Sequence, residues 1–189
     1  MADRLAGAEI AFLVANEGVE QVELTDPWQA VEAEGGHPVL VAPEGGEIQA
    51  FNHRDRADRF PVDLTVAEAD PDHFAGLVLP GGVVNPDRLR TIGAAVAFVR
   101  SFFDHGKPVA AICHAPWMLV EADVVRDRHV TSWPSLRTDL RNAGARWDDN
   151  EVIVDTGGPN VLVTSRKPDD LPAFDREMTG AFAAQRVGR

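Results

Sequence analysis

The sequence has little of what would place it outside a reducing compartment or in a membrane. Cys113 is the single cysteine among 189 residues, so the chain cannot form an internal disulfide. No apolar run approaches the roughly 20 residues that a membrane-spanning helix needs. Charged residues interrupt the N-terminal segment, where a signal peptide would have its apolar core. The chain is therefore expected to be cytoplasmic, without a membrane partner.

Basic residues are also scarce. Lys and Arg number 18 against 30 Asp and Glu, which gives a formal net charge of −12 at pH 7. Binding to a phosphate backbone needs clustered positive charge, so direct nucleic-acid binding is not expected.

The common cofactor motifs are missing as well. The sequence contains no Gly-x-Gly-x-x-Gly dinucleotide fingerprint, no P-loop and no Gly-x-Ser-x-Gly serine elbow. Its six histidines lack the paired spacing of metal ligands. We therefore expect neither a cofactor nor a metal.

What is present is an alternation of short apolar runs with amphipathic stretches, which is typical of a parallel sheet flanked by helices. With no linker or repeat, residues 1–189 are expected to form a single α/β domain. The Gly45-Gly46 pair predicts a hairpin turn, and Thr25-Asp26-Pro27 predicts a helix start. The predicted strands cover residues 10–15, 39–42, 77–79, 108–112, 152–154 and 161–164, and the predicted helices cover 25–34, 94–105, 117–122, 135–143 and 169–185.

Three predicted strand ends contain residues that could do chemistry. Ligands of open parallel sheets bind at the carboxyl ends of strands, and here those ends lead into Glu17, Gly81-Gly82 and Cys113-His114. A strand that runs into Cys-His and then a helix is typical of a nucleophile elbow. The helix N-terminus there favours a thiolate, so we expect the pKa of Cys113 to lie below that of a free thiol. Backbone N–H groups of Gly82 and His114 could hold an oxyanion.

Two acids could assist this pair. Glu17 could hydrogen-bond the sulfur, and Asp87 could orient the imidazole of His114. Each residue also has a structural interpretation. A single intracellular cysteine is often a small buried hydrophobic residue, a Gly-Gly pair is often only a turn, and both acids could be surface residues near helix starts.

At these residues the chain resembles the PfpI family of intracellular cysteine proteases and stress proteins, in the class I glutamine amidotransferase-like superfamily, to which deglycases also belong. The matching stretches are Glu17-Gly-Val-Glu-Gln-Val-Glu-Leu24, Leu77-Val-Leu-Pro-Gly-Gly82, Gly106-Lys-Pro-Val-Ala-Ala-Ile-Cys-His114, Thr131-Ser-Trp-Pro134, Asn142-Ala-Gly144, Val163-Thr-Ser-Arg166 and Pro168-Asp-Asp-Leu-Pro172.

The resemblance implies a flavodoxin-like three-layer sandwich, with a mostly parallel central sheet and helices on both faces. It implies a homodimer or higher oligomer and no cofactor. Cys113 is then the nucleophile with His114 beside it, Glu17 holds the thiolate, and Gly82 and His114 supply oxyanion donors. Asp87 matches an acid that the family often supplies from the neighbouring subunit. Glutaminase members of the superfamily have a His-x-Glu motif late in the chain. Here the late His129 is followed by Val130-Thr131, so amidotransfer is disfavoured.

Two classes of function remain open at this point. The first is a cofactor-independent cysteine hydrolase of stress defence, either a deglycase or glyoxalase-like enzyme on small carbonyl adducts or a peptidase on unfolded protein. The second is a non-catalytic, chaperone-like stress protein whose Cys113 is oxidised. A reactive thiol serves both classes, because thiolate character promotes nucleophilic attack and oxidation alike.

Overall fold

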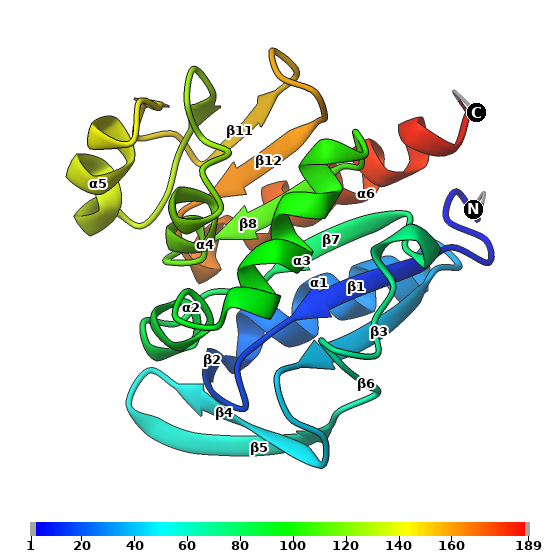
Figure 1. Cartoon of the computed structure of the whole chain (residues 1–189). Helices are drawn as coiled ribbons and strands as arrows, with labels where there is room; N and C mark the ends of the chain where they lie inside the picture. Colours follow the sequence, from blue (N-terminus) through cyan, green and yellow to red (C-terminus); the bar gives the residue numbers. More distant parts are fainter. Residues whose placement is uncertain (1–2, 188–189) are drawn as a thin grey trace.

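A seven-stranded sheet forms the centre of the computed structural model, which describes residues 3–187, with side chains through residue 185 (Figure 1). The strand order is β11-β12-β8-β7-β1-β3-β6. Neighbouring strands run parallel except for the antiparallel β11–β12 pair. The strands are β1 (Glu9–Leu13), β3 (His37–Ala42), β6 (Leu64–Thr65), β7 (Gly76–Leu79), β8 (Val109–Ile112), β11 (Val152–Asp155) and β12 (Leu162–Ser165).

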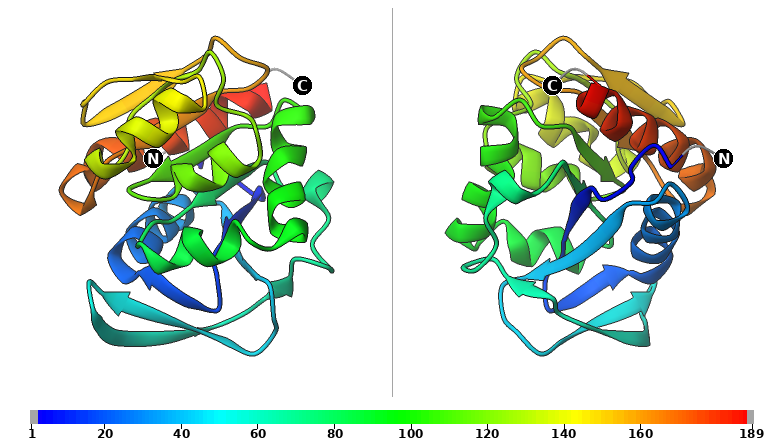
Figure 2. Two further views of the ribbon diagram at one scale, coloured as in Figure 1. Left: turned by 60° about the vertical axis from the view of Figure 1, so that its left-hand side comes forward. Right: turned by 90° about the vertical axis from the view of Figure 1, so that its right-hand side faces the viewer.

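Helices cover both faces of this sheet (Figure 2). Side chains alternate between the faces of a strand, so Ala11 and Leu13 of β1 join one hydrophobic core while Ile10 and Phe12 join the other. The first core packs against α2 (Val84–Leu89), α3 (Gly93–Asp104), α4 (Pro116–Glu121) and α5 (Arg137–Asn142), and the second against α1 (Gln21–Ala33) and α6 (Leu171–Val187). The predicted three-layer α/β sandwich with a mostly parallel sheet is confirmed.

Two smaller sheets and three short 3-10 helices complete the described fold. A three-stranded sheet has the order β2-β4-β5, with β4 and β5 antiparallel, and a two-stranded sheet pairs β9 with β10. These elements are β2 (Glu17–Glu20), β4 (Glu47–Asn52), β5 (Asp55–Pro61), β9 (His129–Val130), β10 (Arg146–Trp147), η1 (Pro71–His73), η2 (Pro134–Leu136) and η3 (Pro168–Asp170).

The predicted hairpin turn at Gly45-Gly46 is wrong. These glycines connect β3 of the central sheet to β4 of the small sheet, two strands that do not pair. The hairpin lies one strand later, between β4 and β5, and its turn is formed by His53 and Arg54. His53 adopts the left-handed conformation there, with φ 59°. The turn lacks the glycine signal on which the prediction depended.

Helix α1 begins one turn earlier than predicted, at Gln21 rather than Thr25. Strand β2 ends at Glu20, and the chain passes directly into the helix. Pro27, predicted at the helix start, lies inside the helix, where it has no N–H to donate. The earlier start places Glu23 in the first turn of α1, at a fully buried position.

Within the described residues, no helix combines the length and the apolar character that crossing a bilayer requires.

Candidate active site

The turn after β8 has the geometry of a nucleophile elbow. Cys113 follows the strand directly and has φ 63°, a conformation that non-glycine residues adopt only where the surroundings enforce it. Its N–H donates to the carbonyl of Ser165 at 3.1 Å, and its carbonyl accepts from the N–H of Trp133 at 2.9 Å. Because β7 lies between β8 and β1, the Gly81-Gly82 turn after β7 lies next to this cysteine.

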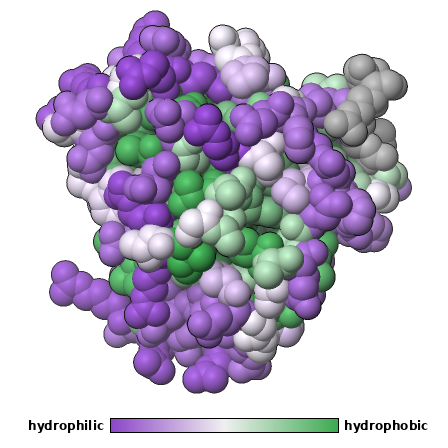
Figure 3. Space-filling view, viewed as in Figure 1, coloured by the Kyte–Doolittle hydropathy of each residue, from purple (hydrophilic) through white to green (hydrophobic). Residues whose placement is uncertain are grey.

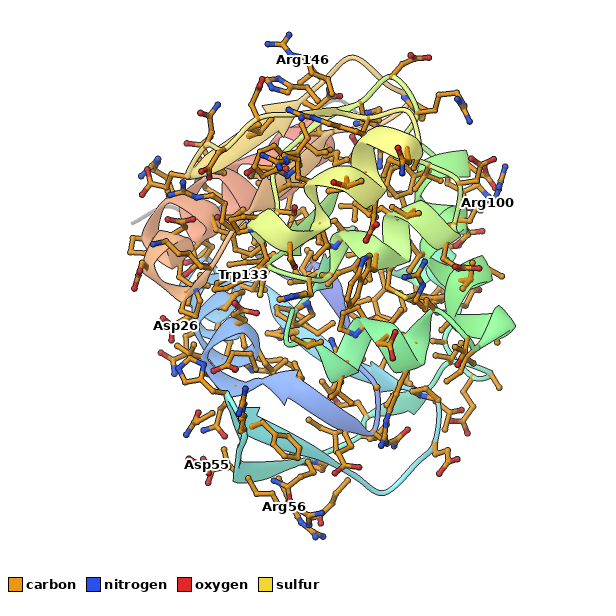
Figure 4. The ribbon with its side chains drawn as sticks, turned by 90° about the vertical axis from the view of Figure 1, so that its left-hand side faces the viewer. Asp26, Asp55, Arg56, Arg100, Trp133 and Arg146 are labelled. Atoms are coloured by element: carbon orange, nitrogen blue, oxygen red, sulfur yellow. The ribbon has the colours of Figure 1, made fainter. Side chains whose placement is uncertain are left out.

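Cys113 lies in the wall of a pocket of about 540 Å³. Figure 4 shows Trp133, one of its lining residues, in the middle of the molecule, with the hairpin residues Asp55 and Arg56 at the lower end. The elements that meet at the pocket are the start of α1 with β2, the β4–β5 hairpin turn, the start of α2, and the segments after β8 and β9. The lining residues are Glu17, Gly18, Glu20, Glu23, Phe51, His53, Arg54, Gly82, Val83, Val84, Arg88, Cys113, His114, Trp133 and Pro168.

The imidazole of His114 lies against the sulfur. Its Nδ1 is 3.1 Å from Cys113 Sγ, and its Nε2 is 3.5 Å from the Ser135 hydroxyl. The ring stacks on Trp133 with centroids 5.7 Å apart and meets the edge of Trp117 at 5.4 Å. Burial lowers the pKa of His114 to about 4, so the ring is neutral at pH 7. A neutral imidazole can accept the thiol proton.

The carboxyl group beside the sulfur belongs to Glu23. Its side chain is fully buried, and neither oxygen forms a hydrogen bond of normal geometry with the residues the structure describes. Burial, and secondly the charge of Glu20, raise the pKa of Glu23 to about 8. The Cys113 thiol and the N–H groups of Gly82 and Gly81 face the carboxyl and act in the opposite direction. Glu23 is therefore protonated at neutral pH.

The expectation of a low pKa for Cys113 is wrong. Burial raises the pKa of the thiol, and the charge of an ionised Glu23 raises it further. The backbone N–H groups of Gly82 and His114 face the sulfur and lower its pKa, but they do not outweigh burial. Helix α4 has only six residues, so its N-terminus contributes little. The resting site consists of a thiol, a neutral imidazole and a protonated carboxyl.

Glu17 does not hold the sulfur as predicted. It begins β2, its side chain is 34% exposed, and it pairs with Arg88 at 3.2 Å and with Arg56 at 3.6 Å. The position against the thiol is taken by Glu23, which the sequence interpretation missed because it started the helix at Thr25. The available signal was an acid between Val22 and Leu24 on a helix that packs on the sheet, since a buried carboxyl is rare unless it has a role.

Asp87 lies on the exposed side of α2. It does not line the pocket, and it forms no hydrogen bond or ion pair with any residue of the described chain. Within one chain it therefore does not orient His114.

Asn85 is a positioning residue that the sequence interpretation also missed. Its side chain is fully buried. Its Oδ1 accepts from the N–H of Ala15 at 2.6 Å, and its Nδ2 donates to the carbonyls of Pro80 at 2.9 Å and Gly81 at 3.2 Å. Asn85 thus ties the end of β1 to the glycine turn that faces the sulfur.

These features define a class of protein: an α/β fold with a cysteine in a left-handed turn directly after a strand of a mostly parallel sheet. Among the described residues, no group of three or more His, Cys, Asp or Glu side chains lies together so that it could hold a metal ion. The chain belongs to the DJ-1/PfpI family, whose model matches residues 8–181. The resemblance drawn from the sequence is confirmed.

Known relatives agree with this assignment. The chain is 41% identical over 169 residues to a deglycase of Pyrococcus horikoshii, covering 89% of this chain and 96% of that protein. It is 40% identical over 169 residues to protein/nucleic acid deglycase 2 of Escherichia coli, covering 89% and 94%. A two-domain protein of Anabaena variabilis, with DJ-1/ThiJ/PfpI-like and ferritin-like domains, superposes with a TM-score of 0.83 at 31% identity, over 96% of this chain and 48% of that one. The chain is an enzyme of the hydrolase or deglycase type.

Proposed function

We propose that this protein is a cysteine-dependent deglycase that converts glyoxal and methylglyoxal adducts into a hydroxy acid and a free amine or thiol. The observation on which the proposal depends is the 3.1 Å contact between Cys113 Sγ and a neutral His114 Nδ1, in a pocket of about 540 Å³. That volume suits a small adduct. The deglycase names of the two relatives support the same class of substrate.

The first step forms a bond between sulfur and the carbon of the adduct that bears the hydroxyl group. As the sulfur attacks, the thiol proton passes to His114 Nδ1. The carbon–nitrogen bond breaks, and the amine leaves with the proton from His114. With free methylglyoxal the sulfur adds to the aldehyde instead, and the N–H groups of Gly82 and His114 stabilise the oxyanion until it is protonated. Both routes give the same hemithioacetal.

The second step converts the hemithioacetal into a thioester. The proton on the carbon bonded to sulfur moves to the neighbouring carbonyl carbon through an enediol, so no electrons enter or leave. Water then hydrolyses the thioester, which releases lactate and restores the thiol. The protonated Glu23 lies against the sulfur and adds no charge to the site. No cofactor is needed for this balance.

The experiment measures lactate from methylglyoxal and from its amine adduct, with wild type and Cys113→Ser, together with cleavage of an unfolded protein. We expect wild type to form lactate and the variant to lose about 10³-fold or more in rate. Cleavage of the unfolded protein alone would identify a peptidase. No turnover of either substrate, with suppression of aggregation that depends on oxidised Cys113, would identify the redox-responsive chaperone.

We also propose that the protein forms a two-fold dimer in which Asp87 of each subunit orients His114 of the other. Two observations support this. Within the described chain no carboxylate pairs with His114, whose Nε2 meets only the Ser135 hydroxyl at 3.5 Å. Asp87 is exposed on α2 near Val83 and Val84, which are 54% and 45% exposed. Large exposed apolar side chains favour an interface.

Mixed dimers test this arrangement. Cys113→Ser and Asp87→Ala proteins, each inactive, are refolded together in equal amounts. With random pairing half of the dimers are mixed, and half of their sites have both residues, so about a quarter of wild-type activity should return. No recovery would show that Asp87 does not complete the neighbouring site, and full activity of Asp87→Ala alone would show that it has no role.

A further inference from the structure

Two of the three acidic side chains that line the Cys113 pocket, Glu17 and Glu23, are ion-paired or uncharged. Glu17 pairs with Arg88 and Arg56. Glu23 is buried and uncharged at neutral pH, since its pKa is raised to about 8. The pocket wall formed by these residues therefore presents little net negative charge, although the whole chain has a formal net charge of −12.

Glu20 is likewise occupied, by the turn of the β4–β5 hairpin. Its carboxylate accepts a hydrogen bond from the N–H of His53 at 3.0 Å, and the His53 ring lies 3.8 Å from the same carboxylate. The contact fixes the hairpin turn at the pocket. Figure 3 shows that hydrophilic side chains cover the lower end of the molecule, where Figure 1 places this hairpin.

Arg54, the next residue of the turn, also lines the pocket. Its guanidinium forms no hydrogen bond or ion pair with any residue that the structure describes. The other two arginines of the hairpin are paired, Arg56 with Glu17 and Arg59 with Glu47 at 3.5 Å. Arg54 thus brings a guanidinium without an ion-pair partner in the described chain to the lining of a pocket in which Glu17 is ion-paired and Glu23 is uncharged.

A guanidinium presents a planar set of donors that matches a carboxylate or a phosphate. We propose that Arg54 binds an anionic group of the substrate, so that the site prefers adducts that have a carboxylate or phosphate in addition to the reactive carbonyl carbon. The inference rests on the proposed deglycase function and assigns its substrate class. The carbonyl carbon then lies at Cys113 and the anionic group at the hairpin turn, in a pocket whose lining also includes the aromatic side chains Phe51 and Trp133.

The test compares the methylglyoxal adducts of N-acetylcysteine and of N-acetylcysteine amide, which differ only in a carboxylate. Wild type is expected to have a kcat/KM about tenfold higher for the carboxylate adduct. In Arg54→Ala this preference should fall to about one through KM, with kcat unchanged, and Arg54→Lys should retain part of it. Arg59→Ala is the matched control, because it removes a cation of the same hairpin outside the pocket, and it should keep the preference.

Equal kcat/KM values for the two adducts in wild type, or an undiminished preference in Arg54→Ala, would overturn the inference. If wild type turned over neither adduct, the deglycase function would fail, and binding would then decide the role of Arg54. In that case, the binding of acetate and of inorganic phosphate is measured by titrating each into the Cys113→Ser protein and into the Cys113→Ser/Arg54→Ala protein. Binding about tenfold weaker without Arg54 supports the anion site and shows which anion it prefers, and equal binding rejects it.

Discussion

Between pH 5 and pH 8, wild type is expected to lose roughly 3 to 4 kcal/mol more of its free energy of unfolding than the Glu23→Gln variant. The pKa of Glu23 is about 8 in the folded protein, against 4.5 for a glutamate side chain that is exposed to water. Across this range the folded state keeps a proton that the unfolded chain has released. Stability therefore falls by about 1.4 kcal/mol for each pH unit, whereas glutamine has no proton to release.

The measurement is urea unfolding of both proteins at the two pH values. His114 has the opposite sign, since its lowered pKa makes stability rise as the pH increases from about 4 to 6.5. It is present in both proteins and cancels in the difference. Glu17→Gln is the matched control, because it removes a second carboxylate of the same pocket, one that is partly exposed and ion-paired with Arg88. A Glu23→Gln curve parallel to wild type would show that Glu23 is ionised throughout.

Gly81→Ala is expected to lower the free energy of unfolding by about 3 kcal/mol and to abolish activity. A Cβ at this position would collide with Oε2 of Glu23, and it would lie 2.6 Å from Cys113 Cβ and 2.8 Å from the carbonyl of Ile112. The last two groups belong to β8 and its turn and cannot move without displacing Cys113. Urea unfolding and lactate formation measure the two effects.

Gly180→Ala provides the comparison for this substitution. Gly180 lies inside α6, and a Cβ there would meet no atom within 4 Å. Alanine is favoured over glycine in a helix by about 1 kcal/mol, so this variant should be slightly more stable than wild type and fully active. A Gly81→Ala protein with the unfolding midpoint of wild type would contradict the close packing of the glycine turn.

The position of the elbow could be predicted from the sequence because the relevant signals are local. A continuous apolar run predicts a buried strand, and a strand that ends in Cys-His predicts a sharp turn, so Cys113 and His114 could be placed at a strand end without long-range information. Gly82 could be placed in the same way, from the strand that precedes it. Parallel strands bring their carboxyl ends to one edge of the sheet, which is where these three residues meet.

The residues that were missed depend on contacts between distant segments. Glu23 could not be separated from Glu17 by spacing alone, because the start of α1 is set by the pairing of β2 with β4. Asn85 bonds residues of two strands that lie far apart in the sequence. The pKa of Cys113 was predicted from its helix, whereas burial beside a carboxyl has the larger effect.

The left-handed turn at Cys113 also limits how the protein can change over time. Among the described residues, four non-glycine positions have positive φ, and two of them, His53 and Cys113, line the same pocket. Such a conformation costs about 1–3 kcal/mol, which a glycine would largely recover. The substitution that relieves the turn is thus the one that deletes the proposed nucleophile. Gains in thermal tolerance must come from elsewhere in the sandwich, and a drift toward stability at this turn would leave a protein with an intact fold but without its single thiol.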